Sequence, residues 1–139
     1  MTGVMGDAIA CAALDLVGTE FRLNGRSATD GVDCIGLAWL AMRRCGIEID
    51  VPVGYALRNR DDGRWRHFFE RANFSELTHA AGSCAGDFWL VKPAAFQAHL
   101  LVHGGPFFIH ADAGLRRVVQ TPWPCIWPVL SIWRFGGAK

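Results

Sequence analysis

The sequence contains few charged residues, and neither sign predominates. Charged side chains make up 19% of the 139 residues, and the formal net charge is +1. A nucleic-acid-binding protein normally carries a basic excess on one face, so we expect no nucleic-acid partner. Since 51% of the residues are hydrophobic and few are charged, intrinsic disorder is excluded as well. The length suits one domain, and we expect a single domain over residues 1–139.

Long apolar segments and an N-terminal leader are also missing. The longest stretch without a charged residue, 93–111, contains three histidines and Gly104-Gly105-Pro106, and the next, 118–133, contains three prolines. Neither could satisfy its backbone as a lipid-exposed helix, so we expect no membrane insertion. Residues 1–7 lack a basic region and a long apolar one, so no secretory signal peptide is predicted. We expect the protein to be made in the cytoplasm and, if exported, to leave by another route.

The cysteines lack any pairing pattern. There are five of them, an odd number, and no two form a CxxC motif. Neither a disulfide framework nor a zinc ribbon is indicated. We interpret most of them as small buried hydrophobic residues, namely Cys11, Cys45, Cys84 and Cys125.

The first half of the sequence has helical patterns. Apolar residues from 5 to 17 recur at helical spacing until Gly18, which predicts an amphipathic helix there. Residues 61–72 predict a surface helix with Trp65, Phe68 and Phe69 facing inward.

A third helix is marked at both ends. Asp33 precedes an apolar run over residues 34–42, Arg43 and Arg44 fall in the last turn, and Gly46 stands where a left-handed cap belongs. Apolar residues cover nearly every face, so we expect this helix to be buried.

The second half has the pattern of strands. Short aromatic or β-branched segments alternate with Gly, Pro or Asp, and predict strands over 87–91, 99–103, 107–111, 115–119 and 129–135. The connections are too short for crossovers, so the sheet should be antiparallel. Helices followed by such a meander predict an α+β domain.

Cys34 is the first candidate for chemistry. It stands at the expected start of the buried helix, where free N–H groups and partial positive charge favour a thiolate. Such a thiolate is the nucleophile of cysteine hydrolases. The alternative is a core cysteine that happens to follow the capping residue Asp33.

Two histidines could serve this cysteine. A turn at Gly104-Gly105 would pair His99 with His110 on one side of the sheet, with Cβ atoms ~4.5–5.5 Å apart. One imidazole could then orient the other as a general base. The alternatives are a packed pair of histidines, or a metal site that also includes His103. Because no Asp or Glu completes such a site, we favour no metal.

Three tryptophans, Trp123, Trp127 and Trp133, are interleaved with three prolines near the C-terminus. We interpret them as closing the core and the sheet edge, with stacking on sugars as the alternative.

Five motifs together resemble a known family, the NlpC-type cell-wall peptidases. In order, they are Gly18-Thr19-Glu20-Phe21-Arg22-Leu23-Asn24-Gly25, Gly31-Val32-Asp33-Cys34-Ile35-Gly36-Leu37, Gly86-Asp87-Phe88-Trp89, Ala98-His99-Leu100-Leu101-Val102 and Phe108-Ile109-His110-Ala111. The resemblance covers residues 5–120. It implies a papain-like fold, with the nucleophile at the start of a buried helix that packs on the antiparallel sheet.

The resemblance also implies a function. Cys34 resembles the nucleophile, His99 the general base and acid, and His110 the residue that orients His99. The implied enzyme is a cysteine endopeptidase or amidase with a Cys-His-His triad and no metal or organic cofactor. Its substrates would be peptide stems of bacterial peptidoglycan, cut between D-glutamate and a diamino acid. The missing leader and wall-binding module resemble the phage-tail and prophage branch, whose members act from a virion and have tail proteins as partners.

Around the nucleophile, the sequence departs from the family pattern. Phe21 stands where the family usually has a tyrosine that positions substrate or oxyanion, and Ile35 replaces a serine. The loop before Cys34 is one residue longer, which could bring Arg22 or Asn24 into the gap. We expect Asp33 to cap the helix and the backbone N–H of Cys34 to be an oxyanion donor. The alternatives are a tail assembly protein with weak or no catalysis, and an amidase or acyltransferase on a non-wall substrate.

Overall fold

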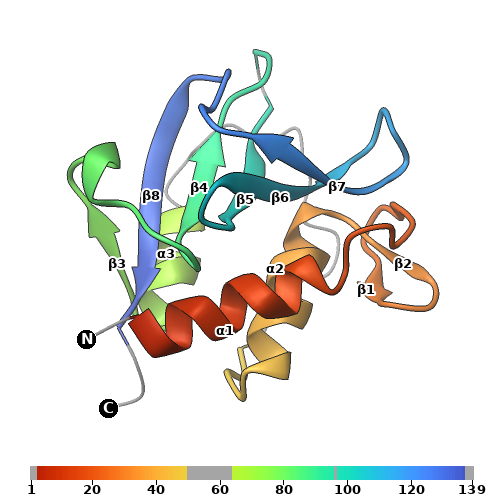
Figure 1. Ribbon diagram of the computed structural model, residues 1–139, viewed down its shortest axis with the longest axis horizontal. Coiled ribbons are helices and arrows are strands. Elements are labelled where there is room, and N and C mark those ends of the chain that lie inside the picture. Colours follow the sequence, from red (N-terminus) through yellow and green to blue (C-terminus); the bar gives the residue numbers. More distant parts are fainter. Residues whose placement is uncertain (1–2, 50–63, 96, 137–139) are drawn as a thin grey trace.

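Three α-helices and one large sheet are present in the computed structural model, which describes residues 3–49, 64–95 and 97–136. The helices are α1 (Gly3–Leu14), α2 (Cys34–Arg44) and α3 (Arg64–Arg71), with a short 3₁₀ helix, η1, at Ala80–Gly82. A small hairpin of β1 (Arg26–Ser27) and β2 (Gly31–Val32) precedes α2. Figure 1 shows α1 and α2 beside each other, with this hairpin at one end of the pair.

The large sheet has six antiparallel strands in the order β3-β8-β4-β5-β6-β7. Their bounds are β3 Phe74–Leu77, β4 Phe88–Val91, β5 His99–His103, β6 Phe107–Asp112, β7 Arg117–Pro122 and β8 Val129–Phe135. Helices first and an antiparallel sheet after them confirm the predicted α+β class.

Helix α2 forms where the sequence predicts it. The side chain of Asp33 accepts a hydrogen bond from the N–H of Gly36 at 2.8 Å, and Gly46 has a φ of +81° just beyond the helix. Most of the helix is buried, as expected.

The other two helices differ from their predicted bounds. Helix α1 ends at Leu14 and not at residue 17, because the N–H groups of Leu16 and Val17 bond to carbonyls three residues back, which makes a tighter turn. Within α3, Trp65 and Phe69 are buried and Phe68 is half-buried, which confirms the inward face. The predicted start of this helix, residues 61–63, lies outside the described residues.

Two strands, β7 and β3, differ from the prediction made from the sequence. The strand expected over 115–119 is β7, Arg117–Pro122, because Oδ1 of Asp112 accepts from the N–H groups of Gly114 and Leu115 and holds that segment in a turn. Strand β3 was not predicted. It is a four-residue strand that contains Ser75 and Glu76, and among the described strands it lies at the sheet edge and pairs with β8 alone.

Alternation along the strands divides the core into two clusters. Leu100 and Ile109 belong to the main core with the helices, whereas Leu101 and Phe108 belong to a smaller cluster. Successive side chains point to opposite faces of a sheet, so His99 and His110 lie on the side of the smaller cluster.

Four of the cysteines are less buried than the sequence predicts. Cys11 and Cys84 are exposed, and Cys45 and Cys125 are only partly buried. Among the five, Cys34 alone is fully buried. Cys11 lies on the outer side of α1, whose buried residues are Ile9, Ala10, Ala12 and Ala13.

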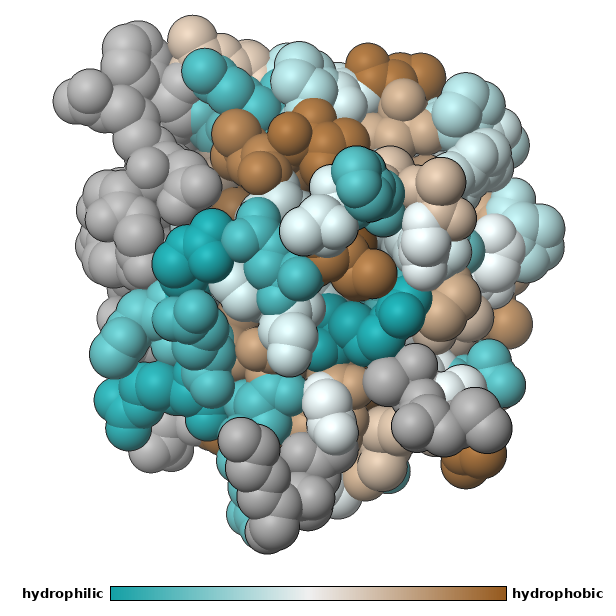
Figure 2. All heavy atoms as spheres, turned by 90° about the vertical axis from the view of Figure 1, so that its left-hand side faces the viewer, coloured by the Kyte–Doolittle hydropathy of each residue, from teal (hydrophilic) through white to brown (hydrophobic). Residues whose placement is uncertain are grey.

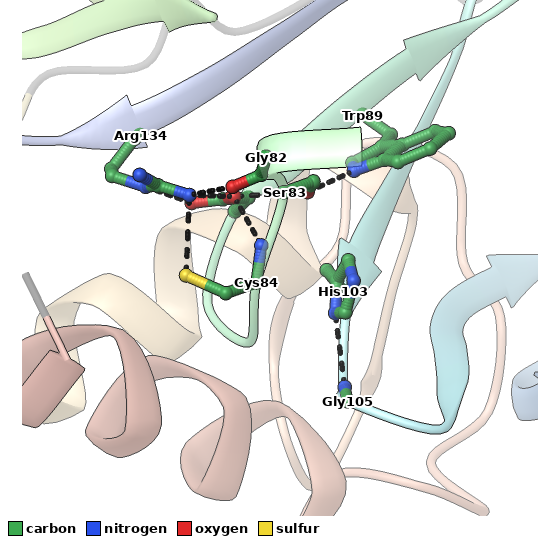
Figure 3. A network of polar contacts seen from close by, with 8 residues as sticks. Gly82, Ser83, Cys84, Trp89, His103, Gly105 and Arg134 are labelled. Carbon is green, nitrogen blue, oxygen red and sulfur yellow. Dashed lines mark hydrogen bonds and ion pairs between the residues drawn. The ribbon is translucent and has the colours of Figure 1, made fainter. Parts of the chain in front are cut away.

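A polar network secures the turn before β4 (Figure 3). The buried carboxylate of Asp87 accepts two hydrogen bonds from the guanidinium of Arg134, both at 2.9 Å. It also accepts from the Ser83 hydroxyl at 2.9 Å and from the N–H of Cys84 at 2.8 Å. The turn and β8 are therefore held together by one charged group.

The face with β3 and α3 is mixed in polarity, with hydrophilic side chains around separate apolar patches (Figure 2). Arg66 and Glu76 form an exposed ion pair at 2.6 Å across these two elements. Among the described residues, no helix has the length and apolarity needed to cross a membrane.

Candidate active site

Cys34 is the first residue of α2 and is 1% exposed. The backbone N–H groups of Leu100, Ile35 and Cys34 lower the pKa of its thiol. Burial and, after it, the charge of Asp33 act more strongly in the other direction and raise the pKa to about 12. In the resting protein the thiol is therefore neutral.

Asp33 holds the start of α2 in place. Besides capping Gly36, its carboxylate accepts from the N–H of Asn24 at 2.8 Å and from the Arg26 guanidinium at 3.2 Å. The carboxylate thus ties the preceding loop to the helix, as its predicted role as a cap requires.

Two residues after Cys34, the backbone at Gly36 approaches the backbone at Gly25 closely. A Cβ at Gly36 would lie 1.9 Å from the carbonyl oxygen of Gly25, so only glycine fits at position 36. This contact explains the glycine two residues after Cys34 in the motif.

His99 and His110 are in direct contact. Nε2 of His99 lies 3.0 Å from Nδ1 of His110, and the two rings are nearly perpendicular. The structure therefore brings together the two histidines that the sequence predicts to interact.

The predicted register between them is wrong by two residues. His103 pairs with Phe108 and Val102 with Ile109, and the N–H of Gly104 bonds to the carbonyl of Phe107. The centre of the turn is therefore Gly105-Pro106 and not Gly104-Gly105, with a φ of +102° at Gly105. His99 and His110 are diagonal neighbours, and they stay on one face because the shift is even.

The hydrogen bond between the rings determines which nitrogen of His99 is free. Because Nε2 faces His110, Nδ1 is the nitrogen left to accept a proton. Burial and then the nearby His110 lower the pKa of His99 from 6.5 to about 4, and burial also lowers the pKa of His110. Nε2 of His110 is buried and has no partner among the described residues. Both rings are thus neutral near pH 7.

The Cys34 thiol lies against β5, the strand that begins with His99. The thiol lies against the N–H of Leu100, the residue that follows His99. No hydrogen bond joins the Cys34 thiol to His99 within the part of the chain that the structure describes.

Trp127 is a neighbour that the sequence analysis did not assign to the site. Its ring centroid lies 5.8 Å from that of His99 and 5.7 Å from that of His110. The only signal was a tryptophan among prolines, which we interpreted as closing the core or sheet edge. Trp133 is indeed buried in the main core, whereas Trp123 is 43% exposed.

The remaining predicted positions lie around the cysteine. Phe21 forms an isolated parallel bridge with Val32 and is packed against the main core. Arg22 is exposed, and its N–H donates to the carbonyl of Val32 at 3.1 Å. Ile35 is 3% exposed, so this position belongs to the core and not to a polar rim.

The described residues contain no group of three or more His, Cys, Asp or Glu side chains placed to hold a metal ion. His103 has another role, since its Nδ1 accepts from the N–H of Gly105 at 3.0 Å and its ring contacts Trp89, Phe108 and Trp123.

Solved structures with the same arrangement identify the fold. NlpC2 and NlpC1 from Trichomonas vaginalis each superpose with a TM-score of 0.72 at 19% identity over 94% of this chain. A Staphylococcus aureus protein described as similar to a lipoprotein of the NLP/P60 family superposes with a TM-score of 0.65 at 18% identity over 96% of the chain. The chain has the NlpC/P60 fold.

The peptidoglycan hydrolase RipB from Mycobacterium tuberculosis also shares the NlpC/P60 fold, with a TM-score of 0.64 and 14% identity over 96% of this chain. The chain spans 65% of the RipB structure but only 46% and 44% of the two Trichomonas chains and 42% of the Staphylococcus chain. No protein-family model and no curated protein matches the sequence.

Proposed function

We propose that this protein is a cysteine hydrolase of the NlpC/P60 type that cleaves peptide stems of bacterial peptidoglycan. The observation that carries the proposal is the buried Cys34 at the start of α2, against the strand that presents His99 to His110. The description of RipB as a peptidoglycan hydrolase supports the substrate class.

In the proposed reaction, Cys34 and His99 begin as neutral partners. A thiol pKa of about 12 and an imidazole pKa of about 4 disfavour a preformed thiolate–imidazolium pair. Proton transfer from Sγ to Nδ1 of His99 therefore accompanies attack of the sulfur on the peptide carbonyl. His110 stabilises the resulting imidazolium because its Nδ1 accepts a hydrogen bond from the N–H at Nε2 of His99.

The negative charge that develops on the carbonyl oxygen needs a donor. The backbone N–H of Cys34, at the positive end of α2, is the donor we propose. The C–N bond then breaks, His99 gives its proton to the leaving amine, and an acyl-enzyme forms. His99 next takes a proton from water, which attacks the thioester and releases the acid and the free thiol.

Hydrolysis of purified sacculi tests this function. The wild-type protein should release soluble fragments, and Cys34→Ala should abolish the release. Cys84→Ala is the matched control, because that cysteine is exposed and distant in sequence from the site, and it should retain activity. Equal release by wild type and Cys34→Ala would contradict the proposal.

The bond that is cut is part of the proposal. We infer cleavage between D-glutamate and the diamino acid from the motifs that resemble NlpC-type peptidases. Mass spectrometry of the released fragments should find a new amino terminus on the diamino acid. A new terminus elsewhere in the stem would refute this assignment, and activity only on acyl donors outside the wall would favour the amidase or acyltransferase alternative.

Association with a phage tail is a further part of the proposal, and it rests on the sequence resemblance alone. Particles purified from an induced lysogen that encodes the protein should contain it in the tail fraction. Its absence from such particles would overturn this part.

A tail assembly protein with weak catalysis is the second candidate. The raised pKa of Cys34 and the apolar Phe21 favour it, since neither assists attack by a thiolate. Alkylation by iodoacetamide near pH 7.5 distinguishes the two candidates. In an enzyme, His99→Ala should slow labelling of Cys34 about tenfold or more, because the base is lost, whereas labelling of the exposed Cys84 in the same sample should not change. Equal rates of Cys34 labelling in wild type and His99→Ala would favour the assembly protein.

A further inference from the structure

Trp127, in the loop between β7 and β8, contacts both histidines of the pair. The planes of the Trp127 indole and His99 ring meet at 84°, as do those of the indole and the His110 ring. The two histidine rings meet at 85°. The indole therefore contacts both partners of the hydrogen bond and not one ring alone.

Contacts at both ends of the segment hold Trp127 there. The N–H of Lys92, just after β4, donates to the carbonyl of Pro128 at 2.9 Å. The Cys125 thiol donates to the carbonyl of Trp127 at 3.5 Å, and the indole packs against the smaller core cluster. Proline fixes its own φ, so the prolines of this loop further restrict the backbone.

We propose that Trp127 is a positioning residue, whose indole covers the hydrogen bond between His99 and His110 and keeps water away from it. The geometry alone carries this proposal, and only its consequence for catalysis rests on the proposed function.

Exclusion of water matters because water competes for both ring nitrogens. A hydrogen bond in a low-dielectric environment is stronger than the same bond in water, and it holds the ring orientation. With Nε2 of His99 occupied by His110, Nδ1 is the nitrogen left to accept a proton. Loss of the indole would let water reach Nε2 and free the ring to rotate.

Besides burial, two titratable neighbours affect the pKa of His99. His110 and Asp112 on β6 act on it in opposite directions, the first lowering and the second raising its pKa. Lys92 follows β4, and Cys34 begins α2. The covering loop contributes one titratable group, Cys125. Burial has the largest effect on the pKa of His99, and the indole is part of what buries the ring.

Titration of the histidine rings by NMR tests the proposal without any assay of activity. Trp127→Ala should raise the pKa of His99 toward its ordinary value, by about one unit or more, because water then solvates the charged form. Trp127→Phe, which keeps an aromatic ring, should give a smaller rise. Trp123→Ala is the matched control. Trp123 is in the same loop, but its ring stacks on that of Phe108, with the two ring centroids 4.8 Å apart. This substitution should leave the titration of His99 unchanged.

Kinetics provide the second readout. If the proposed hydrolysis occurs, Trp127→Ala should lower kcat about tenfold with little change in KM. The substitution would disturb the orientation of the general base His99 and leave the binding of substrate unchanged. Trp127→Phe should restore most of the rate.

The outcomes separate this proposal from the proposed function. An unchanged titration of His99 in folded Trp127→Ala overturns it. If that variant does not fold, a Trp127→Phe titration identical to wild type overturns it equally. If the titration shifts as expected while wild type and variants all lack activity, the role of Trp127 stands and the proposed function fails.

Discussion

Nε2 of His99 lies 3.0 Å from Nδ1 of His110, although the two residues are diagonal and not opposite across the β5–β6 ladder. The diagonal arrangement sets the two rings nearly perpendicular, with their centroids 5.0 Å apart. It leaves Nδ1 of His99 as the nitrogen that can accept a proton, as the proposed general base requires.

If the proposed hydrolysis occurs, removing His110 should weaken it although Cys34 is still present. We expect His110→Ala to lower kcat ~10²-fold or more, since an unsupported imidazole loses its orientation and the stabilisation of its charged form. Release of fragments from sacculi under saturating substrate measures this. His79→Ala is the control, because His79 is exposed and its side chain makes no cap at η1. A His110→Ala rate within twofold of wild type would show that His110 does not orient the base.

Stability should depend on pH through the same residues. His99 is neutral in the folded state down to about pH 4, whereas the unfolded chain binds a proton below its ordinary pKa of 6.5. The free energy of unfolding should therefore fall as the pH decreases from about 6.5 to about 4. The lowered pKa values of His103 and His110 act in the same direction.

At alkaline pH the thiol of Cys34 has the opposite effect. Its folded pKa of about 12 lies above the ordinary 9.0, so the unfolded chain loses its proton first and stability should fall above pH 9. Urea unfolding at a series of pH values should give a maximum between about pH 6.5 and 9. Cys34→Ala should flatten the alkaline side, although the raised pKa of Cys45 leaves part of the slope. An unaltered alkaline slope would contradict this account.

Substitution of Gly36, two residues after Cys34, should destabilise the protein. Gly36→Ala places a Cβ against the carbonyl of Gly25, so the two backbones must separate. We expect a loss of ~1–3 kcal/mol or more in the free energy of unfolding. Gly3→Ala, where a Cβ would meet nothing within 4 Å, should change it little. Equal stability of the two variants in urea would mean that the contact with Gly25 relaxes without cost.

The network at Asp87 should matter more than an exposed pair. Arg134→Ala leaves the carboxylate of Asp87 buried without its cation, which typically costs about 3–5 kcal/mol. Glu76→Gln neutralises an exposed pair and should cost at most ~1 kcal/mol. Thermal unfolding of both variants measures the difference. Similar losses would indicate that the Ser83 and Cys84 donors suffice to stabilise Asp87.

Local sequence was enough to predict two structural features of the candidate site. The start of α2 follows from Asp33 and Cys34, since a cap acts within one turn of the helix. The common face of His99 and His110 follows from strand alternation, which an even register error leaves unchanged.

Long-range contacts account for what the sequence analysis missed. The hairpin register depended on whether Gly104 or Gly105 begins the turn, and both glycines tolerate a positive φ. The exposure of Cys11 and Cys84 depends on which sides of α1 and of the turn before β4 are covered. Trp127 reaches the histidines only because a loop distant in sequence folds over them.

By itself, the sequence determined the α+β class, the capped start of the helix at Cys34 and the candidate histidines, because caps, periodicity and alternation act over a few residues. The tertiary structure alone decided the register of β5 on β6, the cover over the histidines and the ionisation of the site. Burial is a property of everything that surrounds a residue, and it leaves both the Cys34 thiol and the His99 imidazole neutral at rest.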